Sequence, residues 1–130
     1  MPLSAGIIPV RRENEGWVYL LLRVYGYWDF PKGVVEPGED AYHGALRELR
    51  EETGIQKATS RWGCDYYETP RYSGHKIARY YLAEVPDSAI HLTEHHEYRW
   101  VRYRDAEELL GPRVRSVLNW GKEQVEDPPG

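Results

Sequence analysis

Three carboxylates crowd together in the stretch RELREETGI, residues 47–55. Glu48, Glu51 and Glu52 stand three and four positions apart, so they share one face if the stretch is helical. Each like-charged pair at this spacing destabilises an exposed helix by about 0.2–0.5 kcal/mol. The cluster is therefore either a solvated acidic surface, which is the ordinary case, or a site that holds a positive ion between the carboxylates.

The spacing of the residues before the cluster favours the ion site. The segment GVVEPGEDAYHGALRELREETGI, residues 33–55, matches the pattern Gx5Ex7REUxEExGU at every defined position, where U is an apolar residue. At about 6% per fixed position, seven identities arise by chance roughly once in 10⁸ to 10⁹ windows. The segment resembles the Nudix box.

The resemblance implies a fold, an activity and a set of metal ligands. The fold is α+β, an α/β/α sandwich with a central mixed β-sheet between helices. The activity is cleavage of a nucleoside diphosphate linked to another group. The metal-binding and base glutamates of the family map onto Glu48, Glu51 and Glu52, and the family often uses the backbone carbonyl at the position of Gly33 as a further ligand.

The chemistry explains why carboxylates suit this reaction. A phosphoanhydride is protected in water by its own negative charge, which repels nucleophiles. Mg²⁺ prefers oxygen ligands, neutralises phosphate oxygens and lowers the pKa of a bound water. We therefore expect Mg²⁺ as the cofactor, with Mn²⁺ as a substitute. The resemblance assigns Glu39 and Arg47 to orienting the catalytic groups through a charged hydrogen bond.

One more ligand is expected from a distant loop. In family members with a pattern similar to EHHEYRW, residues 94–100, the glutamate six residues before the tryptophan approaches the metals, and here that residue is Glu94. Glu97 is the alternative. The adjacent His95 and His96 suggest zinc in isolation, but no other spacing supports a zinc site. We expect a loop histidine to contact phosphate or solvent.

Three stretches are similar to diadenosine tetraphosphate hydrolases, the asymmetric bis(5′-nucleosyl)-tetraphosphatases. They are YWDFPKGVVEPGE at residues 27–39, RYYLAEV at residues 79–85 and EHHEYRWV at residues 94–101. This resemblance implies cleavage of diadenosine tetraphosphate by water into ATP and AMP. It assigns Tyr80 to stacking on adenine and Lys32 to a phosphate contact. Further candidates for binding the polyphosphate chain or the second base are Arg23, Trp28, His75 and Lys76.

Three other functions stay open. A 5′-end RNA pyrophosphohydrolase shares the box and a W-x-F-P-x-G entrance, but it would need more positive charge along an RNA path. A diphosphoinositol polyphosphate hydrolase is a second enzymatic alternative. The non-enzymatic alternative is a Nudix-fold nucleotide-binding sensor; degenerate members usually lose box glutamates, and here all are present.

The pattern of apolar and turn-forming residues predicts the elements that position these groups. Asp40 is a suitable cap for the start of the box helix, and Gly54 is suited to ending it in a left-handed conformation. Loops are predicted at residues 26–38 and 68–76, and a turn at 11–16. Predicted strands cover residues 3–10, 17–25, 57–67, 76–85 and 98–102, and predicted helices cover 40–53, 105–110 and 113–124.

Length and charge narrow the class of protein. The 130 residues suffice for one hydrophobic core, so we expect a single domain over residues 1–130 with a disordered tail at 127–130. The net charge of −4 argues against an extended nucleic-acid surface, and a small nucleotide is the expected partner. A monomer is expected, with a dimer as the alternative.

The single cysteine and the hydropathy pattern indicate the compartment. Cys64 cannot form an internal disulfide, which fits a reducing cytoplasm. We expect it to be a small buried residue rather than a catalytic thiol. The chain has neither a basic region before an apolar run at its start nor an apolar stretch near 18 residues, so no signal peptide or membrane span is predicted.

Overall fold

The computed structural model describes residues 2–14 and 16–126, and the predicted disordered tail at 127–130 lies outside these residues. The described residues form a mixed sheet in the order β3-β2-β1-β6-β5, with β4 added to β1 and β7 added to β2. Only the β1–β6 pair is parallel among the pairs in this sheet. The elements are β1 (Leu3–Glu13), β2 (Gly16–Val24), β3 (Tyr27–Asp29), β4 (Lys32–Val34), α1 (Ala41–Thr53), β5 (Tyr66–Glu68), β6 (Ile77–Glu84), β7 (Glu97–Val101), α2 (Tyr103–Leu109) and α3 (Pro112–Glu126).

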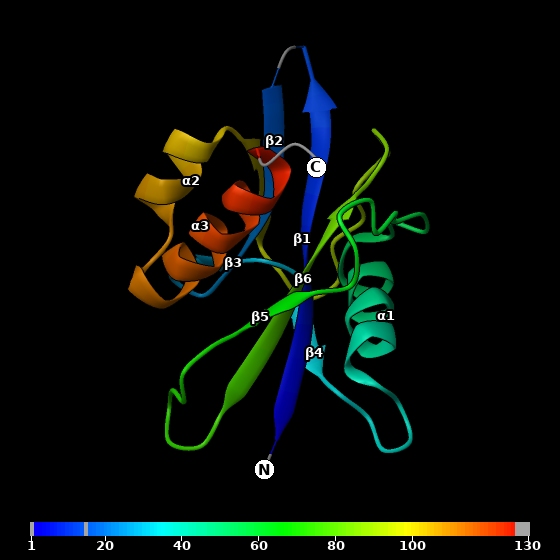
Figure 1. Cartoon of the computed structure of the whole chain (residues 1–130), viewed down its shortest axis with the longest axis vertical. Coiled ribbons are helices and arrows are strands. Elements are labelled where there is room, and N and C mark those ends of the chain that lie inside the picture. The colour runs from blue at the N-terminus through cyan, green and yellow to red at the C-terminus, as the bar shows by residue number, and fades with distance from the viewer. Residues whose placement is uncertain (1, 15, 127–130) are drawn as a thin grey trace.

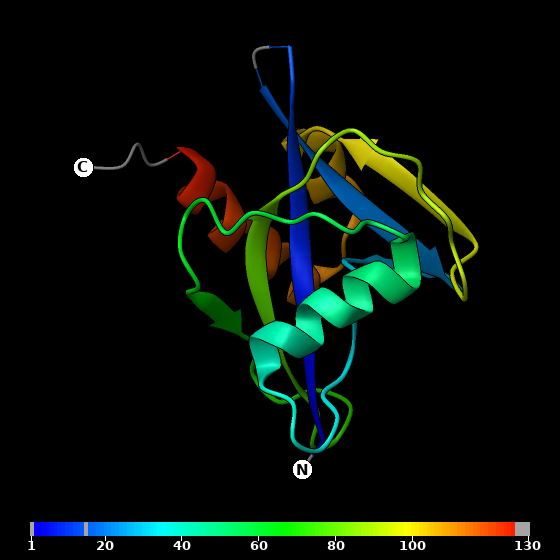
Figure 2. The same ribbon diagram turned by 90° about the vertical axis from the view of Figure 1, so that its right-hand side faces the viewer.

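Helices cover both faces of this sheet (Figure 1). Figure 2 shows α1 in front of the sheet and the pair α2 and α3 behind it. Successive strand residues point to opposite faces, so Ile7 of β1 packs in the cluster with Leu49 of α1, and Ile8 packs in the cluster with Leu118 of α3. The predicted α/β/α sandwich around a mixed sheet is confirmed.

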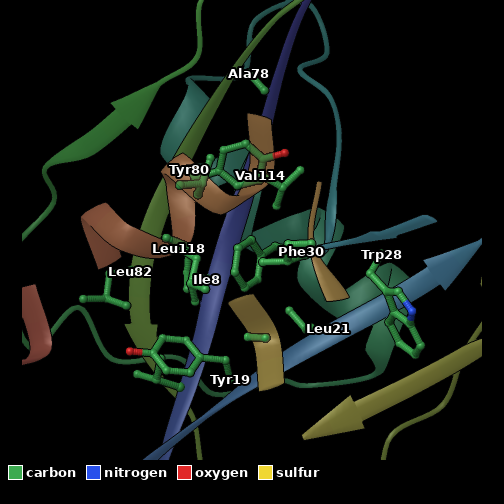
Figure 3. Close-up of a cluster of buried hydrophobic side chains, with 14 residues drawn as sticks. Ile8, Tyr19, Leu21, Trp28, Phe30, Ala78, Tyr80, Leu82, Val114 and Leu118 are labelled. Carbon is green, nitrogen blue, oxygen red and sulfur yellow. The ribbon is translucent and has the colours of Figure 1, made fainter. Parts of the chain in front are cut away.

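The core between the sheet and α3 contains several large aromatic side chains (Figure 3). The rings of Phe30 and Tyr80 meet edge to face, with their centroids 6.1 Å apart. Val114 and Leu118, from α3, complete this cluster. Through Trp28 and Phe30, this cluster packs β3 and the residue after it against the sheet, next to the site described below.

Helix α1 begins and ends where its capping residues predict. The Asp40 carboxylate accepts a hydrogen bond of 2.9 Å from the backbone N–H of His43, which satisfies a free donor of the first turn. Gly54 has φ of 81°, and its N–H donates to the Arg50 carbonyl at 2.9 Å. This left-handed conformation favours glycine because it has no Cβ. The predicted helix and both caps are confirmed.

One strand prediction and one loop prediction are wrong. Residues 57–67 do not form one strand, because Gly63 takes φ of 96° in a turn and only β5, at the end of this segment, pairs with β6. Earlier in the segment, Thr59 makes an isolated bridge with Glu84. Residues 26–38 are not all loop, because they include β3, which pairs with β2, and β4, which pairs with β1.

Smaller differences concern ends and exposure. β1 continues to Glu13, which shortens the predicted turn at 11–16, and α2 starts at Tyr103 rather than at residue 105. Cys64 is exposed rather than buried, because it lies in the irregular segment before β5. No helix in residues 2–14 and 16–126 has the length and apolar character needed to cross a membrane.

Candidate active site

The three box glutamates of α1 lie at very different depths, and two of them, Glu48 and Glu52, contact β4. Glu52 is buried, and its carboxylate accepts a hydrogen bond of 2.8 Å from the backbone N–H of Lys32. Glu48 is also mostly buried, with 14% of its side chain exposed, whereas Glu51 is 57% exposed. A Cβ added to Gly33 would collide with the Glu48 carboxylate, so only glycine permits this approach of β4 to the helix.

Arg47 hydrogen-bonds three carboxylates at once and lies 3.5 Å from a fourth, that of Glu36. Its guanidinium grips Glu39 through two hydrogen bonds of 2.7 and 3.0 Å, which is the bidentate geometry that suits this pair. The same group donates to Glu48 at 2.9 Å and to Glu51 at 3.0 Å. The Arg47 hydrogen bonds lower the pKa of Glu39 to about 2. The structure thus brings together the residues predicted to orient the catalytic groups and those predicted to bind metal.

No three His, Cys, Asp or Glu side chains in residues 2–14 and 16–126 are already gathered as a metal site. Arg47 draws Glu48 and Glu51 toward itself, and the Lys32 N–H holds Glu52. A cation here would therefore have to compete with these hydrogen bonds and reorient the carboxylates.

The residues nevertheless fit a hard divalent cation. Burial, and then the charge of Glu48, raise the pKa of Glu52 to about 8. Burial also raises the pKa of Glu48, against the opposing effect of Arg47. The two neighbouring carboxylates are partly removed from water and repel each other. An added cation would offset both the cost of burying their charge and this repulsion. Their oxygen donors, together with the backbone at Gly33, are the type that Mg²⁺ and Mn²⁺ prefer.

A pocket of about 520 Å³ opens beside Glu52. We call it the acidic pocket, because Asp29, Glu52 and Glu94 line it together with Lys32 and His95. Nε2 of His95 lies 3.7 Å from Oε2 of Glu52, and burial lowers the His95 pKa. Glu94 therefore lies on the wall of the same pocket as the most buried box glutamate.

Two backbone hydrogen bonds hold the loop that carries Glu94. The N–H of His91 donates to the Thr53 carbonyl at the end of α1, and the N–H of His96 donates to the Arg23 carbonyl, both at 2.8 Å. Glu97, the alternative ligand, instead pairs with Arg23 and with Arg99. Of the two glutamates, the structure places Glu94 in the pocket and directs Glu97 elsewhere.

A second pocket, of about 650 Å³, shares Tyr27 and Lys32 with the first. We call it the cationic pocket, because Lys32, Lys76 and Arg113 line it and none of its described lining residues is acidic. Gly33 also borders it, so the cationic pocket adjoins the glutamate edge of α1. The two pockets together offer carboxylates for a cation and, next to them, cations for an anion.

The prediction that Tyr80 stacks on adenine is wrong. Tyr80 has 0% exposure and lies in the core cluster with Phe30 and Val114 (Figure 3), so its ring has no free face for a base. Its hydroxyl donates to Oδ1 of Asp29 at 2.9 Å. Tyr80 therefore supports the floor of the site instead of touching a ligand.

The other predicted substrate residues divide into two groups. Lys32 and Lys76 line the pockets. Trp28 is 8% exposed and lines neither pocket, and the guanidinium carbons of Arg23 and Arg99 lie 5.7 and 5.1 Å from its ring centre, so little of the ring is free for a base or a phosphate. Neither Arg23 nor the exposed His75 is among the residues that line these two pockets.

Several residues at the site were not predicted. Asp29, 6% exposed, accepts hydrogen bonds from Tyr80 and from the N–H of Phe30, and it lies 3.6 Å from Arg113. A carboxylate inside the apolar run around Trp28 is a signal that could have identified it. Arg113 and Tyr72 gave no such signal, because each looks like an ordinary exposed residue in the sequence.

Comparisons with known proteins agree with this geometry. The family model described as the NUDIX domain matches residues 1–121. A Caenorhabditis elegans protein named bis(5′-nucleosyl)-tetraphosphatase (asymmetrical) is 34% identical over 112 residues, covering 79% of this chain and 80% of that protein. A Wolbachia pipientis wMel protein named RNA pyrophosphohydrolase is 30% identical over 135 residues, covering 91% of this chain and 80% of that protein. The crystal structure of a C. elegans Ap4A hydrolase binary complex superposes with a TM-score of 0.86 at 27% identity, covering 97% of this chain and 98% of that one.

Proposed function

Because this chain belongs to the Nudix family of hydrolases, we propose that it hydrolyses diadenosine tetraphosphate to ATP and AMP. In general terms, the bond cleaved is a phosphoanhydride in a nucleoside diphosphate linked to another group. The observation that carries the proposal is the close approach of Gly33, which lines the cationic pocket, to Glu48 on the same helix as Glu52, which lines the acidic pocket. The tetraphosphatase relative and the Ap4A hydrolase structure favour a dinucleoside polyphosphate as substrate.

The family is generally dependent on a divalent metal, and Mg²⁺ is our proposed cofactor, with Mn²⁺ as a substitute. The residues that would hold it are Glu48, Glu51, Glu52, Glu94 and the Gly33 carbonyl. When bound, Mg²⁺ supplies neutralisation of the phosphate charge and lowers the pKa of the attacking water.

The chain's own residues orient the glutamates and bind the phosphates of the substrate. Arg47 fixes Glu39 and limits the positions open to Glu48 and Glu51. Lys32 borders both pockets, where its ammonium can contact phosphate. These residues supply positioning and charge, which are the main requirements of phosphoryl transfer to water.

Hydrolysis at the 5′ end of RNA is the second candidate. The Wolbachia relative, which aligns with 91% of this chain, favours it. The net charge of −4 counts against it, because an RNA chain needs a basic path beyond the reacting phosphates.

We place the protein in the cytoplasm as a monomeric single domain over residues 1–130. The exposed, unpaired Cys64 suits a reducing compartment. Light scattering at several protein concentrations tests the monomer, for which the expected mass is 15.2 kDa.

A substrate panel with Mg²⁺ tests the proposed function. It comprises diadenosine tri-, tetra- and pentaphosphate, triphosphorylated RNA, ADP-ribose and a diphosphoinositol phosphate. We expect the highest kcat/KM for diadenosine tetraphosphate, with ATP and AMP as products, and heavy-oxygen water locates the attacked phosphorus. Stabilisation by a dinucleotide without any product would instead indicate a binding sensor.

The matched variants are Glu52→Gln and Glu108→Gln. Glu52→Gln should lower turnover by orders of magnitude without lowering thermal stability, because it removes a carboxylate and leaves the volume unchanged. Glu108, on α2, is exposed and makes no side-chain hydrogen bond or ion pair with the described residues, so its variant should behave as wild type. Normal turnover by Glu52→Gln would refute the metal assignment.

A further inference from the structure

Arg113 and Tyr72 form a stack at the wall of the cationic pocket. Arg113 is the second residue of α3, and its guanidinium carbon lies 4.0 Å from the centre of the Tyr72 ring. Tyr72 lies in the loop before β6, where two backbone hydrogen bonds, of 3.0 and 3.1 Å, join it to Lys76. Cation–π contact therefore links the start of α3 to this loop.

Buried groups hold the guanidinium from behind. Nη2 of Arg113 lies 3.6 Å from Oδ2 of Asp29, and Nη1 lies 3.4 Å from the Tyr80 hydroxyl. Asp29 and Tyr80 are themselves fixed by their mutual hydrogen bond of 2.9 Å. The direction of the Arg113 side chain is thus set by a ring on one side and a buried carboxylate on another.

The contacts of Arg113 with Asp29 and Tyr80 leave part of the hydrogen-bonding capacity of its guanidinium unused. Arginine has five N–H donors in a rigid fork, and the two contacts of Arg113 with Asp29 and Tyr80 are long. The side chain is 26% exposed and lines the cationic pocket. Donors therefore remain for an anion in that pocket, in the geometry that suits phosphate.

The surroundings of Arg113 select for an extended anion. Lys76 and Lys32 line the same pocket, and none of its described lining residues is a carboxylate. In a chain of net charge −4, this concentration of cations is local. Since the pocket borders Gly33, a chain of phosphates that starts at the glutamate edge can continue into it.

On the basis of the proposed function, we propose that Arg113, stacked on Tyr72 and acting with Lys76, is a specificity-determining residue. It binds the phosphates of the half that leaves as the triphosphate product. It thereby favours substrates with a long phosphate chain over those with a short one. Tyr72 and Asp29 are positioning residues, because they act by holding the guanidinium.

Titration with inorganic tripolyphosphate in EDTA tests the anion site without turnover. Wild type should bind tripolyphosphate more tightly than orthophosphate. Arg113→Ala and Lys76→Ala should each weaken tripolyphosphate binding by about tenfold, which corresponds to the loss of one charged hydrogen bond. The matched controls are Arg104→Ala and Lys57→Ala, at exposed residues with no side-chain hydrogen bond or ion pair to the described part of the chain. Both controls should bind as wild type.

Kinetics separate a specificity role from a structural one. With Mg²⁺, Arg113→Ala should raise KM for diadenosine tetraphosphate and pentaphosphate by about tenfold, with kcat little changed. The KM for diadenosine triphosphate should rise less. Arg113→Lys keeps a positive charge beside Asp29, which protects the fold, but it lacks the planar guanidinium. Its KM for diadenosine tetraphosphate should lie between the values of wild type and Arg113→Ala. Lys76 is exposed, so Lys76→Ala gives the same test if Arg113→Ala does not fold.

The outcomes distinguish this inference from the proposed function. Unchanged tripolyphosphate affinity in folded Arg113→Ala and Lys76→Ala, or an equal KM increase for all three dinucleotides, overturns the inference while the proposed function stands. Wild type that cleaves no dinucleotide overturns the proposed function and the inference with it.

Discussion

The carboxyl group of Glu52 lies almost entirely out of water, with 8% of the residue exposed and its pKa raised to about 8. A fold under selection for stability alone would place an amide or an apolar group there. The single backbone hydrogen bond from Lys32 only partly compensates for the buried charge. The stability that Glu52 costs the metal-free protein is therefore measurable, and it should depend on pH.

We expect Glu52→Gln to stabilise the metal-free protein at alkaline pH. Between the ordinary glutamate pKa of 4.5 and the folded value of about 8, the folded chain keeps a proton that the unfolded chain has lost. Folding therefore weakens as pH rises through this range, and the glutamine variant escapes this loss. Thermal unfolding in EDTA from pH 5 to 9 measures the difference, with Glu108→Gln as control. A difference that stays constant with pH would contradict the assigned cause.

Gly33→Ala should damage the site while sparing the fold. The new Cβ would run into the Glu48 carboxylate and force it away from β4. Because displaced ligands bind metal poorly, we expect turnover and Mg²⁺ affinity to fall by about 10- to 100-fold. Gly111→Ala is the matched control, since a Cβ there meets nothing within 4 Å. Wild-type Mg²⁺ affinity in Gly33→Ala would show that Glu48 tolerates the displacement.

At the scale of the element, helix α1 sets the positions of the glutamates. Its buried side packs Ala45 and Leu49 against the sheet, and its edge carries Glu48 and Glu52 toward β4. The caps set where the helix begins and ends, and the packing of Ala45 and Leu49 sets its rotation relative to the sheet. The caps should therefore affect the site as well as stability.

Asp40→Ala should lower the melting temperature by about 2–5 °C. The variant leaves the N–H of His43 without its side-chain acceptor and frays the first turn of α1. Asp40→Ser restores an acceptor and should recover most of the loss. Differential scanning calorimetry measures both variants. If alanine and serine melt together, the hydrogen bond from His43 does not stabilise the helix start.

Local signals explain which elements the sequence predicted. The bounds of α1 depend on its own capping residues, so they could be predicted from the segment itself. β4 is only three residues long and is a strand because β1 lies beside it. The same holds for β5, whose position is set by its register with β6, where Tyr66 pairs with Tyr81. Non-local pairing of this kind leaves little trace in a single sequence.

The candidate site divides in the same way. The box glutamates were identified by spacing within one helix and its entry. Tyr80 was assigned to a ligand because its strand resembles that of the tetraphosphatases, yet in β6 it points to the face that α3 covers. Arg113 and Asp29 meet only through tertiary packing. Contacts between distant elements decided which side chains are free to bind.

At the scale of the whole molecule, charge is unevenly distributed. The chain carries −4, yet three cations gather in one pocket. Several other arginines pair with a carboxylate, as Arg61 does with Glu84 and Arg79 with Glu68, whereas Arg23 and Arg99 share the single carboxylate of Glu97. Among the described residues, cations without a carboxylate partner also occur beyond the pockets, such as Arg50 on α1 and Arg104 on α2, but these helices lie on opposite faces of the sheet. They therefore form no single basic path for a long polyanion, whereas a short polyphosphate meets three cations in one pocket.

This charge distribution predicts that a longer triphosphorylated RNA is neither bound more tightly nor cleaved more efficiently than a short one. Each phosphate that meets a free cation strengthens binding and steepens its dependence on salt, whereas phosphates over a net acidic surface do neither. We expect kcat/KM for RNAs of two and of twenty nucleotides to agree within about threefold, with equally shallow salt dependence. Both values should lie below that for diadenosine tetraphosphate. A gain above about tenfold for the longer RNA, with a steeper salt slope, would indicate a basic path and favour RNA 5′-end hydrolysis instead.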